Sequence, residues 1–464
     1  MSRVLHLYKR MPVGVRGALK WGYSFIPLRV RLGKDFFRQL AFLEKSQWWS
    51  PAGLENYQNE QLRKLIHHAY RNVPYYNRTF KALKLLPADI KTIQDLPKIP
   101  LLEKDAVRNN LDDFVAINFT KSQLAHITTS GTTGRILDIY SDPRNEFING
   151  GPFEWRFYRW GKYNVDDLCA VFRAFFFKHR SLGKERIYGF NPVQKKVFFS
   201  IYDISEECID AYAAALQRYP VQFLQGYPVS LKKLAELLRA RNWPRPVSPK
   251  AIFTFAEMLL PEHRRIIEDY FGCGIFDWYG MEERTVIACE CEERKGHHIN
   301  SEFGVVEFIK NGVHIEKDTH EIVTTGLTNY AMPFIRYRTE DCGFPLKEKC
   351  SCQRGLPLMR VLGGRTRNYI IDREGNYQQL IGLLDLFSDF ISQYQFVQKK
   401  KGEVEVRVVT KDNYNQKKEK LILGNLHKMF GSKFQFHILP VKEITQTQRG
   451  KIPLVVFAQR TEVS

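Results

Sequence analysis

Short strand-like runs alternate with helical stretches from residue 124 onward, and this alternation constrains the fold more than any other feature of the chain. The runs "ILDIY" and "VQFLQGY" are followed by the helical stretch "SLKKLAELLRARN" and then by "AIFTFAEM". Strands that alternate with helices favour a sheet with crossover connections. We therefore predict an α/β protein whose large domain has mixed sheets and helices.

The beginning of the chain reads differently. Residues 1–120 are predicted to be mostly helical, and apolar residues recur at helical spacing over 58–72. Pro74 disfavours a helical conformation at Val73. A helix is therefore expected to stop before these two residues.

The end of the chain also changes character. After "GGRTRNYIID" it reads as a small α+β unit with strands at "YQFVQ", "EVEVRVV" and "FQFHIL" and a helix over about 415–429. The predicted domains are a large one over 1–365 and a small, mobile one over 366–464.

Composition narrows the class of protein. The chain has 464 residues, is 44% hydrophobic and carries a formal charge of +20. This charge favours anionic partners such as nucleotides, polyphosphates, acidic membranes or nucleic acid. No nucleic-acid reading module accompanies it, so specific nucleic-acid binding is not expected. We find no signal peptide and no apolar run of about 18 residues, and we expect a soluble, cytoplasmic protein.

A loop rich in hydroxyl groups and glycine has the composition of a phosphate-binding segment. It contains Thr128, Thr129, Ser130, Gly131, Thr132, Thr133 and Gly134, followed by Arg135. Small side chains leave backbone N–H groups free to face phosphate oxygens, and the hydroxyls add donors. The Walker spacing is absent, so an ordinary P-loop is excluded. A plain Ser/Thr/Gly turn remains the alternative.

Four further stretches occur in order along the chain: "GYPVSL", "DWYGMEE", "MPFIRYRTED" and "TQTQRGKIPLVV". Together with the loop they resemble the motifs of the adenylate-forming enzymes. Within that superfamily the chain is most similar to the phenylacetate–CoA ligase branch and its CapK-type relatives. The resemblance covers nearly the whole chain.

The resemblance implies roles for individual residues. The segment from Thr128 to Gly134 would hold the β- and γ-phosphates of ATP, with Arg135 adding charge. Tyr279, beside Gly280, would lie near adenine, and Asp341 would accept hydrogen bonds from the ribose hydroxyls. Arg365 would stand at the hinge between the two domains.

Two residues are implied to act in catalysis. Glu283 would bind Mg²⁺, a hard cation that prefers carboxylate oxygens. Lys451, on the small domain, would reach the α-phosphate and the attacking carboxylate. The alternatives are an exposed glutamate at a helix start and a solvated lysine near the end of the chain.

Tyr227 in "GYPVSL" and Glu257 in "TFAEML" are the implied substrate contacts. The aromatic run "FRAFFFKHR", residues 172–180, is assigned to the core rather than to a pocket. The chain departs from the family pattern at four positions, which bear on the ribose site, the nucleotide segment and the hinge. They are Glu340, which stands at the family glycine, Phe255, where relatives often have glycine, and Arg367 and Asn368, where relatives often have two aspartates.

Two clusters of soft metal ligands lie about sixty residues apart. "CECEERKGHH" holds Cys289, Cys291, His297 and His298, and "CSC" holds Cys350 and Cys352. The two clusters together would close one tetrahedral zinc site. Supported by similar elements in relatives, we predict Cys291, His298, Cys350 and Cys352 as ligands, with His297 and Cys289 as alternates. Such a site would be structural; cysteines and histidines without a metal are the alternative.

The first fifty residues are strongly basic, with ten Lys and Arg against Asp35 and Glu44, and with aromatic residues among them. One interpretation is a helix on an anionic membrane surface. The other, which the sequence favours, is a solvated basic helix packed on the body of the protein.

The function that the resemblance implies is ATP-dependent adenylation of a carboxylic acid. Pyrophosphate would leave, and the acyl group would pass to CoA. The implied cofactors are ATP, Mg²⁺ and CoA, and the implied assembly is a homodimer. CapK-type relatives also suggest surface-polysaccharide synthesis, with a sugar amine or hydroxyl as acceptor. The alternative is a different class of function, in which the chain is not an enzyme and binds a partner in an assembly.

Overall fold

The computed structural model describes residues 11, 13–128, 137–164, 166–174, 187–310, 320–362, 369–375, 377–380, 390–444 and 454–457. The helices of these residues are α2 (Val13–Ser24), α3 (Leu28–Ser46), α4 (Pro51–Asn72), α5 (Pro74–Ala82), α6 (Lys104–Asn109), α7 (Leu111–Phe114), α8 (Pro143–Asn149), α9 (Gly151–Trp160), α10 (Ile209–Arg218), α11 (Pro228–Ala240), α12 (Pro261–Phe271) and α14 (Gln416–Phe430). Three 3₁₀ turns join them: η1 (Pro87–Asp89), η2 (Ile93–Lys98) and η3 (Lys121–Gln123).

The strands are β1 (Ala125–Thr128), β2 (Asp138–Ser141), β3 (Cys169–Arg173), β4 (Tyr188–Asn191), β5 (Lys196–Ser200), β6 (Phe223–Gly226), β7 (Ala251–Phe255), β8 (Ile275–Gly280), β9 (Ile287–Glu290), β10 (His297–Ile299), β11 (Gly304–Ile309), β12 (His320–Gly326), β13 (Tyr337–Leu346), β14 (Leu358–Val361), β15 (Tyr369–Ile371), β16 (Tyr377–Gln379), β17 (Ile391–Lys400), β18 (Glu403–Thr410), β19 (Gln435–Pro440) and β20 (Val455–Phe457).

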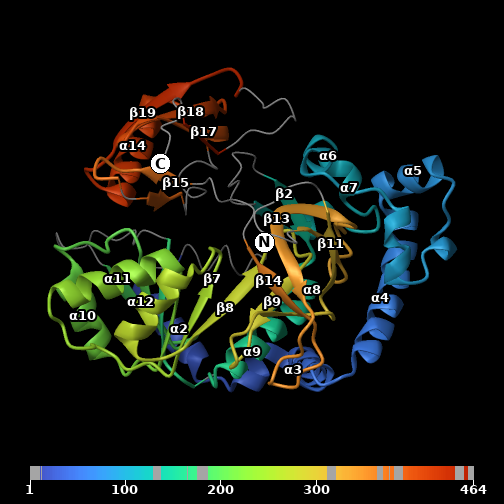
Figure 1. Cartoon of the computed structure of the whole chain (residues 1–464), viewed down its shortest axis with the longest axis horizontal. Coiled ribbons are helices and arrows are strands. Elements are labelled where there is room, and N and C mark those ends of the chain that lie inside the picture. The colour runs from blue at the N-terminus through green and yellow to red at the C-terminus, as the bar shows by residue number, and fades with distance from the viewer. Residues whose placement is uncertain are drawn as a thin grey trace.

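Most strands of the large part of the chain belong to one mixed sheet. Its order within the described residues is β11-β12-β13-β14-β10-β9-β8-β7-β6-β3-β5-β4. The run from β5 through β3, β6 and β7 to β8 is parallel, and the other pairs are antiparallel. Helices α10, α11 and α12 lie together beside the parallel part (Figure 1). The predicted α/β class is confirmed.

The local predictions that fall on described residues are also confirmed. Helix α4 begins after Ser50, whose side chain accepts a hydrogen bond from the backbone N–H of Gly53, and it ends at Asn72. The serine cap and the proline that follows it start the helix, and Pro74 prevents its continuation through Val73.

The C-terminal part forms its own small sheet, in the order β19-β18-β17-β20, with helix α14 beside it (Figure 1). Its apolar side chains make a separate buried cluster that includes Tyr394, Phe396 and Ile422. The predicted strands and helix of this part are present. We call it the small lobe, and the rest of the chain the large lobe.

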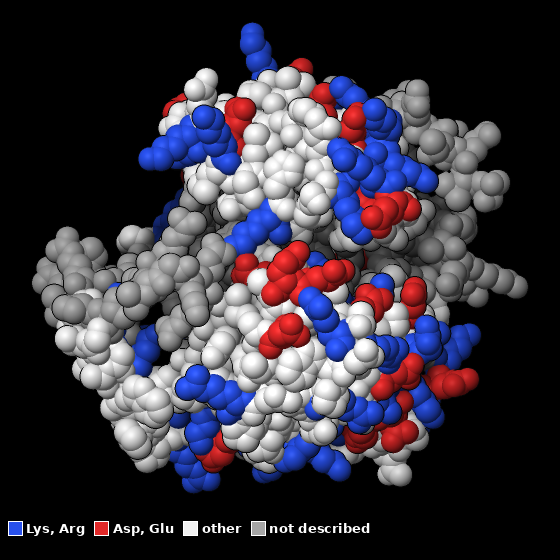
Figure 2. Space-filling model, turned by 90° about the vertical axis from the view of Figure 1, so that its left-hand side faces the viewer, with Lys and Arg blue, Asp and Glu red and all other residues white. Residues whose placement is uncertain are grey.

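Both signs of charge are interspersed on the two lobes, on the face shown in Figure 2. Lys428 of α14 forms a 3.0 Å ion pair with Asp203, which follows β5 in the large lobe. This face is therefore mixed in charge rather than uniformly basic.

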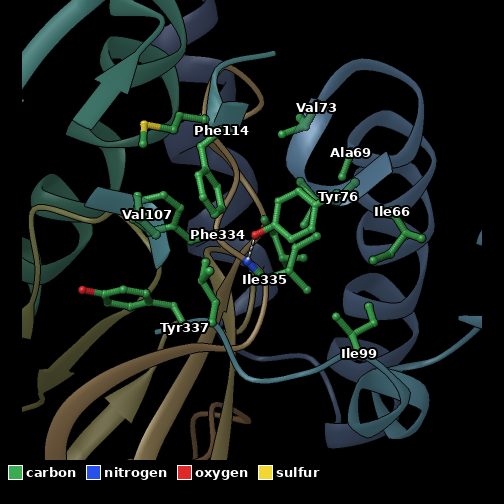
Figure 3. Close-up of a cluster of buried hydrophobic side chains, with 14 of the residues drawn as sticks. Ile66, Ala69, Val73, Tyr76, Ile99, Val107, Phe114, Phe334, Ile335 and Tyr337 are labelled. Atoms are coloured by element: carbon green, nitrogen blue, oxygen red, sulfur yellow. Dashed lines mark hydrogen bonds between the residues drawn. The ribbon is translucent and has the colours of Figure 1, made fainter. Parts of the chain in front are cut away.

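A buried apolar cluster joins the N-terminal helices to the segment that precedes β13. Side chains of α4 and α5 pack against Phe334 and Ile335 (Figure 3). The hydroxyl of Tyr76 donates to the carbonyl of Pro333 at 3.1 Å and accepts from the N–H of Ile335 at 2.9 Å. This cluster fixes the beginning of β13. That strand carries Tyr337, which contacts Glu283, and Asp341, which contacts Tyr279.

Helix α3 is joined to the sheet by a buried ion pair. Arg156 of α9 bonds to Glu302 at 2.8 Å, and the same guanidinium donates to the carbonyl of Leu43 in α3. Ser46, at the end of α3, donates to the same glutamate. Breaking a buried pair costs about 3–5 kcal/mol, so the second half of α3 is firmly anchored.

Candidate active site

A pocket of about 260 Å³ lies at the carboxyl ends of the parallel strands. Its lining includes Arg173 at the end of β3, Gln225 in β6, Phe255 at the end of β7 and Trp278 in β8. Open α/β sheets bind ligands at this edge, because the strand ends and the following loops converge there. The volume suits a small molecule.

One wall of the pocket is a chain of hydrogen bonds. The hydroxyl of Tyr158 in α9 donates to Oε1 of Glu154 at 2.5 Å and accepts from the amide of Gln225 at 2.6 Å. Lys196 of β5 donates to the other end of that amide at 3.2 Å. The other walls include Phe157, Phe255, Trp278 and Ile287. The pocket is therefore apolar on one side and polar on the other.

The sequence analysis missed this wall. Glu154 and Tyr158 lie in the aromatic run "FEWRFYRW", which reads as a core helix, and nothing in their spacing indicates a partner on β6. In the run assigned to the core, Phe172 is indeed fully buried, but Arg173 faces the pocket. Residues 175–180 of that run lie outside the described part.

The two predicted substrate residues both lie at the start of α11. Tyr227 precedes α11, and its ring lies 5.3 Å from that of Phe255. Oε2 of Glu257 accepts a hydrogen bond of 3.3 Å from the N–H of Val229 in the first turn of α11. Its Oε1 is buried without a hydrogen-bond partner among the described residues. Burial raises the pKa of Glu257 to about 8, so the carboxyl is neutral near pH 7.

Two of the predicted nucleotide contacts meet directly. Tyr279, one residue beyond Trp278 on β8, donates its hydroxyl to Oδ2 of Asp341 on β13 at 3.0 Å. Gly280 ends β8. The two side chains come from strands that are far apart in the sheet order, so only the fold brings them together.

Glu283 lies in the turn between β8 and β9, not at the start of a helix. It is buried, and its Oε1 accepts a hydrogen bond of 2.9 Å from the hydroxyl of Tyr337, the first residue of β13. The ring of Tyr337 belongs to the cluster of Figure 3, where its hydroxyl points away from Tyr76. The carboxylate is a hard oxygen donor and fits Mg²⁺.

Thr128 is the last residue of β1, which pairs with β2 so that Thr128 faces Asp138. The glycine-rich segment is thus the connection between two antiparallel strands. Thr129, Ser130, Gly131, Thr132, Thr133, Gly134 and Arg135 lie outside the described residues, as do Arg365, Arg367, Asn368 and Lys451.

Glu340 has a backbone φ of +64°, in the left-handed region. By the resemblance, this is the position of the family glycine. Glycine adopts this conformation without strain, whereas a residue with a Cβ is strained there. Glu340 therefore holds a conformation that favours glycine, one residue before Asp341. Phe255 differs, because the positive φ in its segment falls on the next residue, Ala256, at +67°.

A metal-ligand cluster forms from the four residues predicted as zinc ligands. The ligand atoms of Cys291, His298, Cys350 and Cys352 all lie within 4.8 Å of one another. Cys291 follows β9, His298 lies in β10, and the two other cysteines lie between β13 and β14. Two or three soft donors with a histidine are the donor set of structural zinc sites.

Hydrogen bonds orient the side chains of the metal-ligand cluster. Nδ1 of His298 lies 3.1 Å from the carbonyl of Leu356, which orients Nε2 toward Cys352 at 3.3 Å. Burial raises the pKa of the Cys291 thiol, which favours its protonated form when no cation is bound. Burial also opposes ionisation of Cys352, but hydrogen bonds from His298 and Arg354 lower its pKa to about 6.

The alternates have other partners. His297 bonds to Asp277 at 3.0 Å, and the thiol of Cys289 accepts from Asn300 at 3.7 Å. Neither belongs to the metal-ligand cluster.

Comparison with known proteins identifies a matching family model and several similar proteins. Residues 370–457 match the CapK C-terminal domain. The chain is 22% identical to Protein CapK of Staphylococcus aureus over 463 residues, covering 96% of this chain and 97% of that protein. It is 25% identical to phenylacetate-coenzyme A ligase of Thermus thermophilus over 373 residues, covering 76% of this chain and 80% of that protein.

The fold is that of a CoA ligase of known structure. 2-Hydroxyisobutyryl-CoA ligase, in the postadenylation state with an acyl-AMP, superposes with a TM-score of 0.57 at 15% identity, over 89% of this chain and 91% of that one. No helix of the described residues is long and apolar enough to cross a membrane. By sequence and fold, this chain is a homologue of CapK and of the phenylacetate–CoA ligases.

Proposed function

We propose that the chain is an AMP-forming ligase that activates a small carboxylic acid with ATP and transfers the acyl group to CoA. The observation that carries this proposal is the placement of the pocket. It opens at the carboxyl ends of the parallel strands, beside the pair Tyr279–Asp341 and the turn that holds Glu283. The pocket would take the acid, and the adjoining residues would take the nucleotide.

The reaction has two steps. A carboxylate oxygen of the acid attacks the α-phosphorus of ATP, and pyrophosphate leaves. The CoA thiol then attacks the acyl carbonyl, loses its proton, and AMP leaves. Lys451 would stabilise the charge at the α-phosphate, and Asp341 would hold the ribose. Mg²⁺, held by Glu283, would neutralise phosphate charge when bound.

The polar wall supports a proposal for the class of acid. Glu154 is half-buried and its carboxylate can only accept hydrogen bonds, so it favours a donor on the substrate. The facing aromatic side chains favour a flat or apolar body. We infer a small acid that carries a hydroxyl or amino group at the end remote from its carboxylate.

The metal-ligand cluster would hold zinc as a structural ion. All four positions of a tetrahedron are supplied by protein, which leaves no open site for chemistry. Bound zinc would tie β9 and β10 to the loop between β13 and β14.

Pyrophosphate release tests the activity. The chain is incubated with ATP, Mg²⁺ and a panel of carboxylic acids, with Lys451→Ala as the inactive comparison. We expect release that depends on the acid and falls by about 100-fold or more in the variant, because one preorganised charge at the reacting centre is removed. If no acid gives release above that of the variant, the alternative of a non-catalytic, partner-binding protein is favoured.

The same panel tests the class of acid and the acceptor. It pairs phenylacetate with 4-hydroxyphenylacetate and 4-aminophenylacetate. We expect a higher kcat/KM for the substituted acids, and Glu154→Gln should reduce that preference. Equal rates on all three acids would contradict the assignment of Glu154 while leaving the ligase activity intact. Accumulation of acyl-AMP without a CoA thioester would point to a sugar amine or hydroxyl as acceptor.

A further inference from the structure

Helix α2 and the beginning of α3 lie outside the buried core. From Gly14 to Asp35 no residue is buried, and the first buried side chain is that of Phe36. The backbone of α3 leaves the helical conformation at Gly33, where φ is +76° and ψ is 170°. This break separates the segment before it from the part of α3 that Arg156 anchors.

The contacts between this segment and the body are few among the described residues. The ring of Trp21 lies 6.1 Å from that of Phe190 on the edge strand β4. Arg31 donates to the carbonyl of Val193 at 2.7 Å. A Cβ built on Gly14, Gly17 or Gly22 would meet nothing within 4 Å, so these positions face open space.

Large apolar side chains are concentrated on this segment. Phe25 is 80% exposed, Val30 69% and Trp21 53%. The other exposed apolar residues of the segment are Val15, Leu19, Tyr23 and Ile26. Val15, Leu19 and Tyr23 are spaced by four, which places them along one side of α2. A monomeric protein rarely exposes so many adjoining apolar side chains without a partner.

The charge of the segment is uniform. Residues 13–34 contain Arg16, Lys20, Arg29, Arg31 and Lys34 and no Asp or Glu. A second copy of this segment would bring like charges together, which opposes self-association. An anionic lipid surface, in contrast, attracts the cations and accepts apolar and aromatic side chains at its interface.

We propose that residues 13–34 form a docking surface for an anionic lipid bilayer. Helix α2 would lie in the plane of the interface, with its apolar side chains among the lipid headgroups and acyl chains and its cations at the phosphates. The three glycines make α2 weak in water, and the interface would supply the packing that the protein body does not. The anchored part of α3 would hold the large lobe against the surface. This inference is independent of the ligase activity.

Sedimentation with vesicles tests the proposal on the full-length protein. Vesicles of phosphatidylcholine alone are compared with vesicles of phosphatidylcholine and phosphatidylglycerol. We expect binding only to the anionic vesicles, weakened by added salt because salt screens the charges. Each cation replaced, as in Lys20→Ala and Arg29→Ala, should weaken binding about fivefold.

A double variant separates the apolar contribution from the charge. Phe25→Ser with Val30→Ser should abolish vesicle binding, whereas Ile117→Ser with Leu421→Ser, which alters exposed apolar residues elsewhere, should not. Both variants change exposed side chains and should keep the wild-type melting temperature. Two results would overturn the proposal: anionic binding that survives the first double variant, or a dimer in sedimentation equilibrium that this variant dissociates.

Discussion

The hydroxyl of Tyr337 donates a hydrogen bond of 2.9 Å to the buried carboxylate of Glu283. The ring of Tyr337 packs in the apolar cluster of α4 and α5, so its hydroxyl is held in place by the core. The contact links the packing of the N-terminal helices to a residue expected to bind Mg²⁺.

Tyr337→Phe should therefore weaken the response to Mg²⁺. Partners that orient a metal ligand contribute about 10-fold or more to metal affinity or activity. We expect a higher Mg²⁺ concentration at half-maximal pyrophosphate release. Tyr76→Phe is the control, because Tyr76 lies in the same cluster. Among the described residues its hydroxyl bonds to the backbone of Pro333 and of Ile335, the latter bond drawn in Figure 3. It should cost about 1–3 kcal/mol of stability with an unchanged Mg²⁺ response.

Glu257 should make stability depend on pH. Its pKa is about 8 in the folded protein against 4.5 as the ordinary value. A carboxyl with a raised folded pKa stabilises the fold fully below the ordinary pKa, and the contribution is lost as pH rises toward 8, at up to about 1.4 kcal/mol per pH unit. Chemical denaturation between about pH 5 and 8 should show a slope that Glu257→Gln removes. An unchanged slope in the variant would assign the effect to another group.

Zinc should be present in the isolated protein. We expect metal analysis to find zinc at about one ion per chain. Cys352→Ser should lower the zinc content and the melting temperature together, and a chelator should lower the melting temperature of the wild type. Cys208→Ser is the matched control, since Cys208 is a half-buried free cysteine outside the cluster. Zinc retained fully by Cys352→Ser would argue against this ligand.

Glu340→Gly should stabilise the protein relative to Glu340→Ala. Both variants lose the glutamate side chain, so their difference isolates the backbone, whose φ is +64°. A residue with a Cβ costs roughly 1–2 kcal/mol in this conformation. Urea denaturation of the two variants measures the difference directly. Equal midpoints would show that the local backbone relaxes without strain.

The predicted metal-ligand cluster illustrates how far sequence reasoning reached. Residue type and resemblance selected Cys291, His298, Cys350 and Cys352, and these are the four whose ligand atoms lie together. Spacing alone did not separate them from Cys289 and His297. His297 and His298 are neighbours in β10 and point to opposite faces, and which face meets the distant "CSC" segment depends on the register of β10 with β9 and β14. Cys289 lies within β9, whereas Cys291 follows the end of that strand.

The pocket wall shows the opposite case. Glu154, Tyr158 and Gln225 are joined by hydrogen bonds between α9 and β6, about seventy residues apart at the widest. In the sequence each of them sits among core-like neighbours. Their polarity carries no information about a partner until the helix is placed across the strand ends.

The sequence by itself determined the local elements and the chemistry available: where α4 ends, which strands and helix build the small lobe, and which residue types stand in each motif. Backbone preference and the spacing of apolar residues depend on residues that are near one another in the chain. These features can therefore be predicted from the sequence. Only the tertiary structure decided that Tyr337 meets Glu283, and that none of residues 14–34 is buried although the sequence favours a helix packed on the body of the protein. Whether a side chain is buried, and which residue it bonds to, depends on contacts between segments that are distant in the sequence. Local sequence patterns do not identify those contacts.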